Sequence, residues 1–374
     1  MKEAQLVACL QALVRTPSPQ TALLEAEPAV TSFIAKTVQP MLAQAGHPGR
    51  LDAMGNLIVE AGPPDAKRCA MILTYAMTHP ASSMRDPFAG ELVDGAVRGR
   101  GATEQKGALA AAIDAFVSLE NPSERLVLAV STAGETGQHK AAESILTALD
   151  RTPDVCIVAI GTGGKISLAN KGRVDVHIDV RGKASHSSTP WLGVDAILGA
   201  HAVIERLRAL DLGNDAHPLL GRPTLTPTSI RSWPEATHTI QNRVAMTWDR
   251  RLLPGQDPKA AVAAIGEALR ELKTWEIDVR GGALQFPAEL PPDGAFMQCA
   301  REGHRRAGLG EPDTFVSHGC VDAGLLVRKG CEAAMWGPGE QALWHTDDER
   351  LPVRELVQSA AAYLGFLQAF QERK

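Results

Sequence analysis

The stretch RGRGATEQKG at residues 98–107 holds the side chains best suited to chemistry in this sequence. Gly99 and Gly101 permit a tight turn, and Thr103 is suited to cap a helix that follows it. Glu104 would then lie at a helix N-terminus beyond a strand end, where open α/β sheets place their active sites. A carboxylate there also offsets the helix dipole, so a plain capping role stays open beside a catalytic one.

Two other chemistries have less support. The G-x-G of residues 99–101 lacks both the G-x-x-x-x-G-K-[ST] order and a third glycine at the required place, so we set a nucleotide-binding loop aside. Cys320 could be a nucleophile, but no His–Asp pattern surrounds it, which favours a buried thiol. The 6 cysteines lie far apart without a C-x-x-C pair. This argues against a disulfide framework or a thiolate zinc site and indicates reduced thiols in a cytoplasmic protein.

The elements that must position these residues follow from hydrophobic periodicity. Apolar runs alternate with helical patterns as far as residue 160, which predicts an α/β domain with a mostly parallel, covered sheet. The expected helices span residues 2–14, 27–45, 106–119 and 141–149. The expected strands span residues 51–60 (a pair turning at residues 55–56), 69–75, 126–131 and 154–160.

The pattern changes near residue 171, where strands begin to alternate apolar and polar residues. Four such strands (174–180, 224–231, 243–249 and 275–280) and two helices (194–210 and 259–272) predict a four-strand, two-helix α+β unit of roughly 110 residues. Helical patterns resume at 296–306 and 356–370. The simplest interpretation is a small domain at 173–284 inserted into a larger one built from 1–172 and 285–374.

Composition excludes several classes of protein. The 374 residues suggest two or three domains, and 44% apolar with 22% charged residues is typical of a globular chain. The net charge of −5 without a long basic run argues against nucleic acid as a partner. The first 19 residues include Glu3 and interrupt their apolar runs, unlike a signal peptide. No stretch approaches the ~20 apolar residues that span a bilayer, so we expect no membrane partner.

A series of short motifs occurs in a fixed order between residues 73 and 353: LTYAMTHP, DPFAGEL, GRGATEQKG, AGETG, TGGKI…NKGR, GKASHSSTP, WDRRLLPG, GCVDA and GPGEQALWH. Together they resemble the zinc aminoacylase, acetylornithine deacetylase, succinyl-diaminopimelate desuccinylase and carboxypeptidase G family of metallopeptidases. The resemblance implies a phosphorylase/hydrolase-like catalytic α/β domain with an inserted lid that forms a homodimer. It also implies two zinc ions held by five side chains, a glutamate as general base, and a lid histidine that polarises the scissile carbonyl.

The metal positions implied by this resemblance are altered here. The first histidine ligand is replaced by Ala76, and the aspartate that orients it is replaced by Thr78. The bridging aspartate becomes Glu104, and a later acidic ligand becomes Ile160. One of the two ions therefore keeps a single ligand. Because alanine and isoleucine offer no lone pair, the sequence argues against a dinuclear site and indicates a divergent family member.

The resemblance assigns the other ion to Glu104, Glu135 and His345. A histidine with two carboxylates can hold one zinc or manganese ion with open positions, so a single ion or none remains possible. The general-base glutamate is replaced by Gly134, a loss worth roughly 10²–10⁴ in rate. His79, Glu104, Glu135 and His139 are nearby substitutes. Without a metal, close carboxylates at Glu104 and Glu135 would raise each other's pKa towards neutrality.

The lid motifs match the family better. His186 matches the histidine that stabilises the oxyanion in the partner's site. Arg251 matches an arginine whose planar fork binds a substrate carboxylate, and the lid's usual asparagine aligns with His238. Asp322 and the turn at residues 337–339 match substrate-facing loops. Together with His79, we expect His238, Arg251 and Asp322 to bind substrate, and Glu104, Glu135 and His186 to act in catalysis.

Three functions remain open. The first is a hydrolase that cleaves an amide or related C–N bond of a small, carboxylate-bearing molecule with one metal ion or none. The second is an acid–base enzyme of another type, such as a lyase, an isomerase or an acyl transferase. The third is a pseudo-hydrolase that binds but does not turn over. Elemental analysis, with hydrolysis assays before and after chelation, separates these hypotheses.

Overall fold

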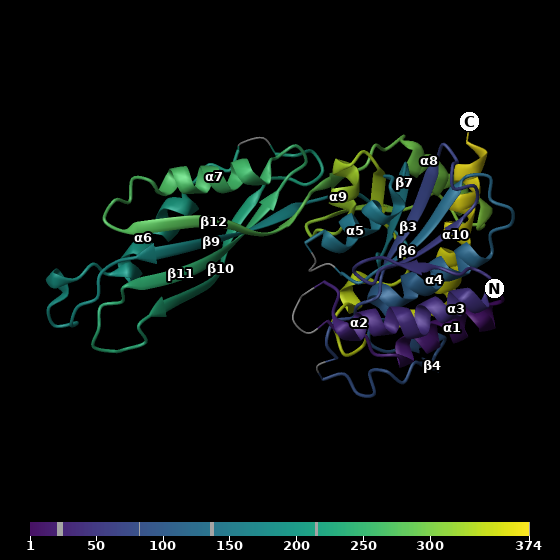
Figure 1. The fold of residues 1–374 in the computed structure, drawn as a ribbon, viewed down its shortest axis with the longest axis horizontal. Coiled ribbons are helices and arrows are strands. Elements are labelled where there is room, and N and C mark those ends of the chain that lie inside the picture. Colours follow the sequence, from purple (N-terminus) through teal and green to yellow (C-terminus); the bar gives the residue numbers. More distant parts are fainter. Residues whose placement is uncertain (21–24, 82, 135–137, 214–215, 374) are drawn as a thin grey trace. The chain divides into compact units, whose positions relative to one another are not determined.

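The computed structural model describes residues 1–20, 25–81, 83–134, 138–213 and 216–373 (Figure 1). The chain divides into two compact units. Unit 1 comprises residues 1–169, 288–317 and 321–374, and unit 2 comprises residues 170–287 and 318–320. Unit 2 therefore interrupts unit 1 in the sequence, and its main segment extends three residues beyond each end of the expected 173–284 insertion.

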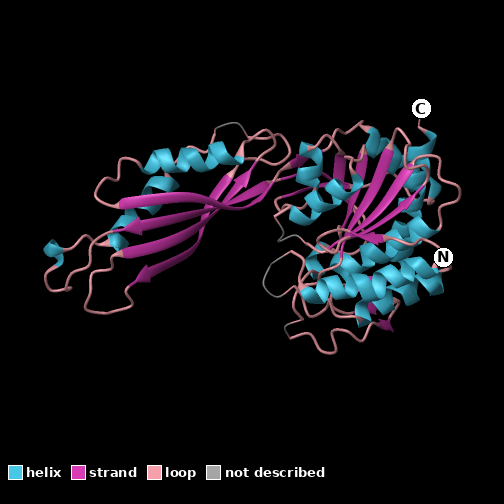
Figure 2. Ribbon diagram, in the orientation of Figure 1, coloured by secondary structure: helices cyan, strands magenta, loops and turns pink. Residues whose placement is uncertain are grey.

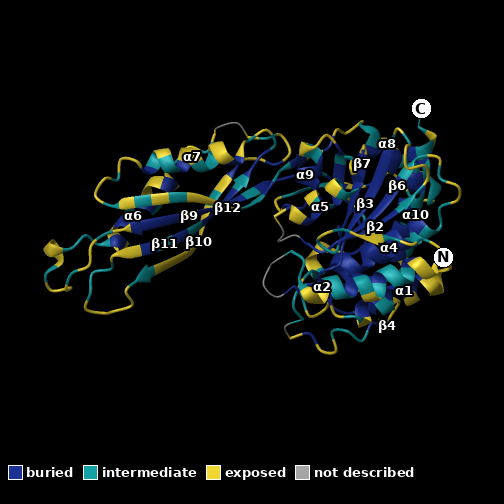
Figure 3. Cartoon of the chain, viewed as in Figure 1, coloured by how far each residue is buried: buried dark blue, intermediate teal, exposed yellow. Residues whose placement is uncertain are grey.

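A six-stranded sheet forms the centre of unit 1 (Figure 2). Its order is β1 (Arg50–Leu51), β2 (Leu57–Ala61), β6 (Arg125–Ser131), β3 (Cys69–Tyr75), β7 (Val155–Ala159) and β15 (Glu332–Met335). Pairing is parallel from β6 through β3 and β7 to β15, and antiparallel where β2 and β1 extend one edge. The long apolar runs of β3, β6 and β7 are buried (Figure 3), as strands covered on both faces require.

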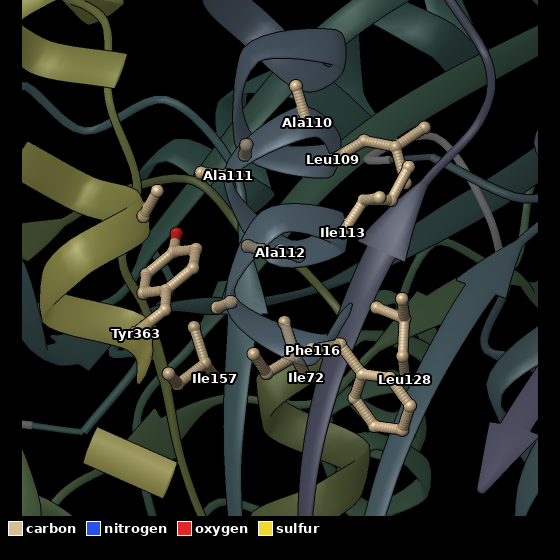
Figure 4. Packing of buried hydrophobic residues seen from close by; sticks show 14 of the residues in the cluster. Ile72, Leu109, Ala110, Ala111, Ala112, Ile113, Phe116, Leu128, Ile157 and Tyr363 are labelled. Atoms are coloured by element: carbon tan, nitrogen blue, oxygen red, sulfur yellow. The ribbon is translucent and has the colours of Figure 1, made fainter. Parts of the chain in front are cut away.

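Alternate residues of these strands enter two different hydrophobic clusters, one on each face of the sheet. Ile72 belongs to the cluster that includes Phe116 and Tyr363, whereas its neighbours Met71 and Leu73 belong to the other. Figure 4 shows Phe116 beside Ile72 on the first face. The alanine-rich α4 (Gly107–Val117) packs there because its small side chains let the helix backbone come close to the sheet.

The other helices of unit 1 cover these two faces. Residues 28–44 form one continuous helical stretch made of α2 (Pro28–Phe33), a π-helical turn η1 (Ile34–Val38) and α3 (Gln39–Gln44). The remaining helical elements are α1 (Glu3–Arg15), η2 (Ala102–Lys106), α5 (Lys140–Leu149), α8 (Ala295–Arg306), α9 (Ala323–Arg328), η4 (Gln341–Leu343) and α10 (Val353–Glu372).

Two further small sheets of unit 1 were not predicted. One has the order β13 (Ala288–Glu289), β8 (Ile166–Asn170) and β14 (Thr314–Ser317), and the other has the order β16 (Arg350–Pro352), β5 (Ala96–Arg98) and β4 (Glu91–Val93). Their strands have two to five residues. Runs this short carry too few residues for a periodicity of two to be recognised.

Unit 2 is a four-stranded antiparallel sheet with two helices. The strand order is β10 (Thr224–Trp233), β11 (Arg243–Leu252), β9 (Gly172–Arg181) and β12 (Glu276–Gln285). One face packs on α6 (Ala196–Arg208) and α7 (Pro258–Leu269), and the short helix η3 (Pro190–Leu192) precedes α6. Asp195 and Asp257 cap α6 and α7 through their carboxylates. Within the described residues, no helix combines the length and apolarity needed to cross a membrane.

Candidate functional site

Four loops of unit 1 follow the carboxyl ends of parallel strands, the edge at which α/β sheets place their ligands. They follow β3, β6, β7 and β15 at residues 76–79, 132–134, 160–164 and 336–339. Backbone hydrogen bonds join neighbouring loops: Ala76 N–H donates to Ser131 C=O (3.0 Å), and Thr162 N–H donates to Gly337 C=O (3.0 Å). These four loops, here called the strand-end rim, therefore lie along one edge of the sheet, and these bonds join them in two pairs.

Glu104 is held at this rim by the glycine-rich turn before it. Gly101 has φ +82°, and a Cβ there would lie 2.5 Å from Thr78 Cγ2, so only glycine fits without strain. The turn leads into η2, and Glu104 C=O accepts a hydrogen bond from Gly161 N–H (2.8 Å). The Glu104 side chain is completely buried.

The prediction that Thr103 caps this helix is wrong. Its hydroxyl donates instead to Arg350 C=O, and the carboxylate of Glu349 accepts the backbone N–H groups of Thr103 and Glu104 (3.2 Å each). Glu349 also pairs with Arg100 (3.0 Å), and both side chains are fully buried. Burial raises the pKa of Glu349, while these N–H donors and Arg100 lower it.

Glu104 contacts a histidine from a distant part of the chain. Its Oε1 lies 3.0 Å from His345 Nε2, and the side chain of His345 is 35% exposed while that of Glu104 is 0% exposed. The ring of His79 stacks on that of His345, with centroids 4.0 Å apart and planes 23° apart. The structure thus brings together three of the predicted site residues. When ionised, Glu104 can only accept, so it holds the His345 proton on Nε2 and leaves Nδ1 as the basic nitrogen.

The position of the expected general base has been refilled by a neighbouring side chain. A Cβ on Gly134 would lie 2.5 Å from both Cγ and Sδ of Met77, which is 3% exposed. Gln105 Nε2 lies 3.1 Å from the same sulfur. Ala76 and Ile160, at the altered ligand positions, are fully buried. Apolar atoms therefore occupy the space that acidic and imidazole groups would need.

The described residues do not complete a metal site. Within them, no group of three or more His, Cys, Asp or Glu side chains is arranged to hold an ion. Glu104 and His345 supply two donor atoms, and the third expected ligand, Glu135, lies outside the described residues. Ala76 and Ile160 supply none, so the donors do not fit a dinuclear centre.

Asp322 is buried rather than presented to a ligand. It is 2% exposed, and its Oδ2 accepts a hydrogen bond from Tyr75 OH (3.0 Å) while Oδ1 lies 2.6 Å from His139 Nδ1. Burial is the main cause that raises the pKa of Tyr75, and the Asp322 charge adds to it. This geometry gives Asp322 the role of fixing the tautomer of His139. Sequence reasoning missed Tyr75, which reads there as the last residue of an apolar strand.

The predicted site residues of unit 2 lie in two places. His186 and His238 lie in adjoining loops, joined by Ser187 N–H donating to His238 C=O (2.8 Å), and their rings are 6.5 Å apart. Arg251 forms a two-pronged pair with Asp249 (2.8 and 3.0 Å) and donates to His318 C=O (3.2 Å).

The expected fork of Arg251 is thus already engaged by a carboxylate of its own strand. Cys320, which we expected to be a buried thiol, is 9% exposed, and its Sγ lies 2.6 Å from Gln285 Oε1.

Comparison with known proteins agrees with this architecture. Residues 168–276 match the model of the peptidase dimerisation domain M20_dimer. The chain is 28% identical over 270 residues to a putative [LysW]-lysine/[LysW]-ornithine hydrolase of Pyrobaculum aerophilum, covering 72% of this chain and 73% of that protein. It is 27% identical to the acetylornithine deacetylase of Myxococcus xanthus, covering 72% and 71%.

Solved structures share the fold. An M20 family metallo-carboxypeptidase from Sulfolobus solfataricus superposes with a TM-score of 0.79 at 16% identity, covering 99% of both chains. A tripeptidase from Staphylococcus aureus does so with a TM-score of 0.77 at 19% identity, covering 100% of both chains. The chain therefore shares the fold of these M20 structures, and its residues 168–276 resemble a peptidase dimerisation domain.

Proposed function

We propose that the chain is a hydrolase that cleaves an amide or related C–N bond of a small, carboxylate-bearing molecule at the strand-end rim of unit 1. The observation that carries this proposal is the Glu104–His345 pair, in which a fully buried carboxylate orients a partly exposed imidazole. A carboxylate–histidine pair is a common general base, because the carboxylate fixes the tautomer and stabilises the imidazolium.

In the proposed reaction, His345 takes a proton from the attacking water as its oxygen bonds to the acyl carbon. The C–N bond then breaks, and the same proton passes to the leaving nitrogen. His79, stacked on His345, would line the same site. His186 is proposed to stabilise the oxyanion, and His238, beside it, to contact the substrate. We derive no step through a metal; if one zinc or manganese ion binds, we propose Glu104, Glu135 and His345 as its ligands.

The relatives suggest the class of substrate. Their names refer to acetylornithine, succinyl-diaminopimelate and [LysW]-linked lysine or ornithine, and those of the structural neighbours refer to tripeptides and to carboxypeptidase activity. N-acyl amino acids and short peptides share an amide next to a carboxylate. We propose that class for this chain. Arg251 would bind the substrate carboxylate after one of its two hydrogen bonds to Asp249 breaks.

A catalytically inactive binding protein is the second candidate, because one observation favours it. Met77 occupies the space beside Gly134, so the side chain that would activate water in the family is both absent and sterically excluded. This candidate keeps the same site and the same ligand class but predicts binding without turnover.

Hydrolysis assays with metal analysis test these candidates. N-acetylornithine, N-succinyl-diaminopimelate and dipeptides are incubated with the purified chain before and after chelation, and with Glu104→Gln and His345→Gln variants. Each variant should lower kcat by about 10²–10⁴, whereas Glu120→Gln, an exposed control, should not. Turnover unchanged by both variants contradicts the proposal. Binding of the panel without turnover supports the second candidate.

We also propose a homodimer formed through unit 2. The match to a dimerisation domain supports it, and so do the exposed apolar side chains Leu198 (62%) on α6 and Ile230 (57%) on the edge strand β10. Leu198→Glu and Ile230→Glu should halve the mass measured by light scattering. The control is Leu92→Glu, which changes a leucine of unit 1 that is 52% exposed. An unchanged mass in both unit 2 variants contradicts this interface.

A further inference from the structure

Unit 1 contains a cavity that shares Gly163, Gly164 and Trp336 with the strand-end rim but is lined by neither Glu104 nor His345. It has a volume of about 200 Å³ and lies between α8, α10 and the turn at residues 163–164 that joins β7 to β8. Its polar lining includes His304, Glu311, Asp313 and Glu355, and Trp336 forms part of its wall. Neither the candidate reaction nor the family comparison uses these side chains.

His304 gives this cavity a defined hydrogen-bond acceptor. The residue is 8% exposed, and its Nδ1 lies 3.0 Å from Gly310 C=O. Because a carbonyl oxygen can only accept, Nδ1 must carry the proton. Burial lowers the pKa of His304, so the ring is neutral near pH 7 and Nε2 presents a lone pair. No described residue donates a hydrogen bond to that nitrogen.

The charged residues that line the cavity are acidic. They are Glu311, Asp313 and Glu355, and the described lining residues include no lysine or arginine. Two arginines lie outside the lining: Arg301 is 3.7 Å from Glu311 and also pairs with Asp293 (3.6 Å), and the charge of Arg354 lowers the pKa of Glu355, which burial raises. Glu355 Oε2 accepts Gly339 N–H (3.0 Å), which fixes its carboxylate in place.

The apolar part of the wall is rigid. Trp336 is 1% exposed, its Nε1 donates to Gly164 C=O (3.1 Å), and its ring lies 5.5 Å from that of His304. The ring of Tyr363 packs edge-on against the indole, at a centroid distance of 5.1 Å and an interplanar angle of 78°. An aromatic wall of this kind suits the methylene groups of a short aliphatic chain and the cation that they carry.

We propose that this cavity binds a small molecule with a primary ammonium group on a short aliphatic stem. The ammonium has only N–H donors, which match the Nε2 lone pair of His304 and the surrounding carboxylates. The stem lies along Trp336. This site is independent of the proposed hydrolysis, because none of its side chains belongs to the Glu104–His345 pair.

Calorimetric titration of the full chain tests the proposal, with 1,4-diaminobutane as the probe and 1,4-butanediol as its uncharged match. The diamine should bind and the diol should not. Glu355→Gln keeps an oxygen for Gly339 N–H but removes the charge, and it should weaken diamine binding at least about tenfold. Glu120→Gln removes the same charge from an exposed site and should leave binding unchanged.

The Glu120→Gln control distinguishes specific binding in the cavity from general attraction of a cation to a chain of net charge −5. Equal weakening by Glu355→Gln and Glu120→Gln, equal binding of diol and diamine, or no binding of the diamine at millimolar concentration overturns the proposal. Nitrogen-15 NMR of the wild-type chain gives a second readout that needs no variant: the His304 Nε2 resonance should shift on titration. A static Nε2 resonance under saturating diamine contradicts the assigned contact.

Discussion

Replacing Gly134 by alanine tests whether Met77 has taken over the space of the missing general base. The new Cβ would lie 2.5 Å from Met77 Cγ and Sδ and 2.8 Å from Cε. Carbon atoms in contact normally lie about 3.5–4.0 Å apart, so the overlap is roughly 1 Å. Met77 is buried and its sulfur contacts Gln105, so a shift of the Met77 side chain would lose packing contacts. We expect a loss of about 1–3 kcal/mol in the free energy of unfolding.

A double-mutant cycle isolates the coupling between the two residues. Met77→Ala alone creates a cavity and should cost about 2–5 kcal/mol. In the double variant the new methyl group enters the vacated space, so the combined loss should be at least about 1 kcal/mol smaller than the sum of the single losses. Urea unfolding followed by circular dichroism gives each value from the midpoint and slope.

Strict additivity of the two changes would refute the idea that Met77 fills this space. The same geometry predicts that Gly134→Glu alone disrupts the rim, whereas Met77→Ala with Gly134→Glu is the smallest change that makes room for an acidic side chain there.

Three further predictions concern buried groups of unit 1. Asp322→Asn removes the charged partner of His139 and should lower the free energy of unfolding by about 1.5–3 kcal/mol, measured by urea unfolding. Arg100→Met leaves the Glu349 carboxylate buried without its cation and should cost about 3–5 kcal/mol; the double change with Glu349→Gln should recover part of this loss. Burial lowers the pKa of Lys106 to about 7. Because the unfolded chain keeps that proton up to ~10.4, this lysine makes stability rise with pH above about 7, and Lys106→Met should flatten that rise in unfolding measured across this range.

Periodicity predicted the elements whose burial is regular along the chain. The run at Cys69–Tyr75 forms a strand with every residue buried, and Gly172–Arg181 alternates as a sheet with one exposed face should. It did not predict the strands at Ala96–Arg98 and Arg350–Pro352, which pair with each other across about 250 positions. A segment of three residues is too short to show a hydrophobic periodicity, and only the folded chain brings such segments together.

In the candidate site, too, some residues were predicted from the sequence and others were not. The motif order placed Glu104, His79 and His345 in one site, and the structure brings these three side chains together. Glu349 was missed because nothing near it in sequence indicates that its carboxylate caps residues 103–104 from some 245 positions away. Thr103 was misassigned because a hydroxyl at a helix start is a cap only when no stronger acceptor competes for the same N–H groups.

The pattern of what changed and what stayed argues for a reshaped site rather than an eroded one. At three of the altered positions the surroundings are apolar: Ala76 and Ile160 are fully buried, and Met77 packs beside Gly134. Position 104, in contrast, holds a carboxylate. Burying a carboxylate completely lowers the free energy of unfolding by several kcal/mol unless its partners compensate for the lost solvation. A buried carboxylate hydrogen-bonded to an imidazole that reaches solvent is the arrangement that the proposed acid–base pair requires.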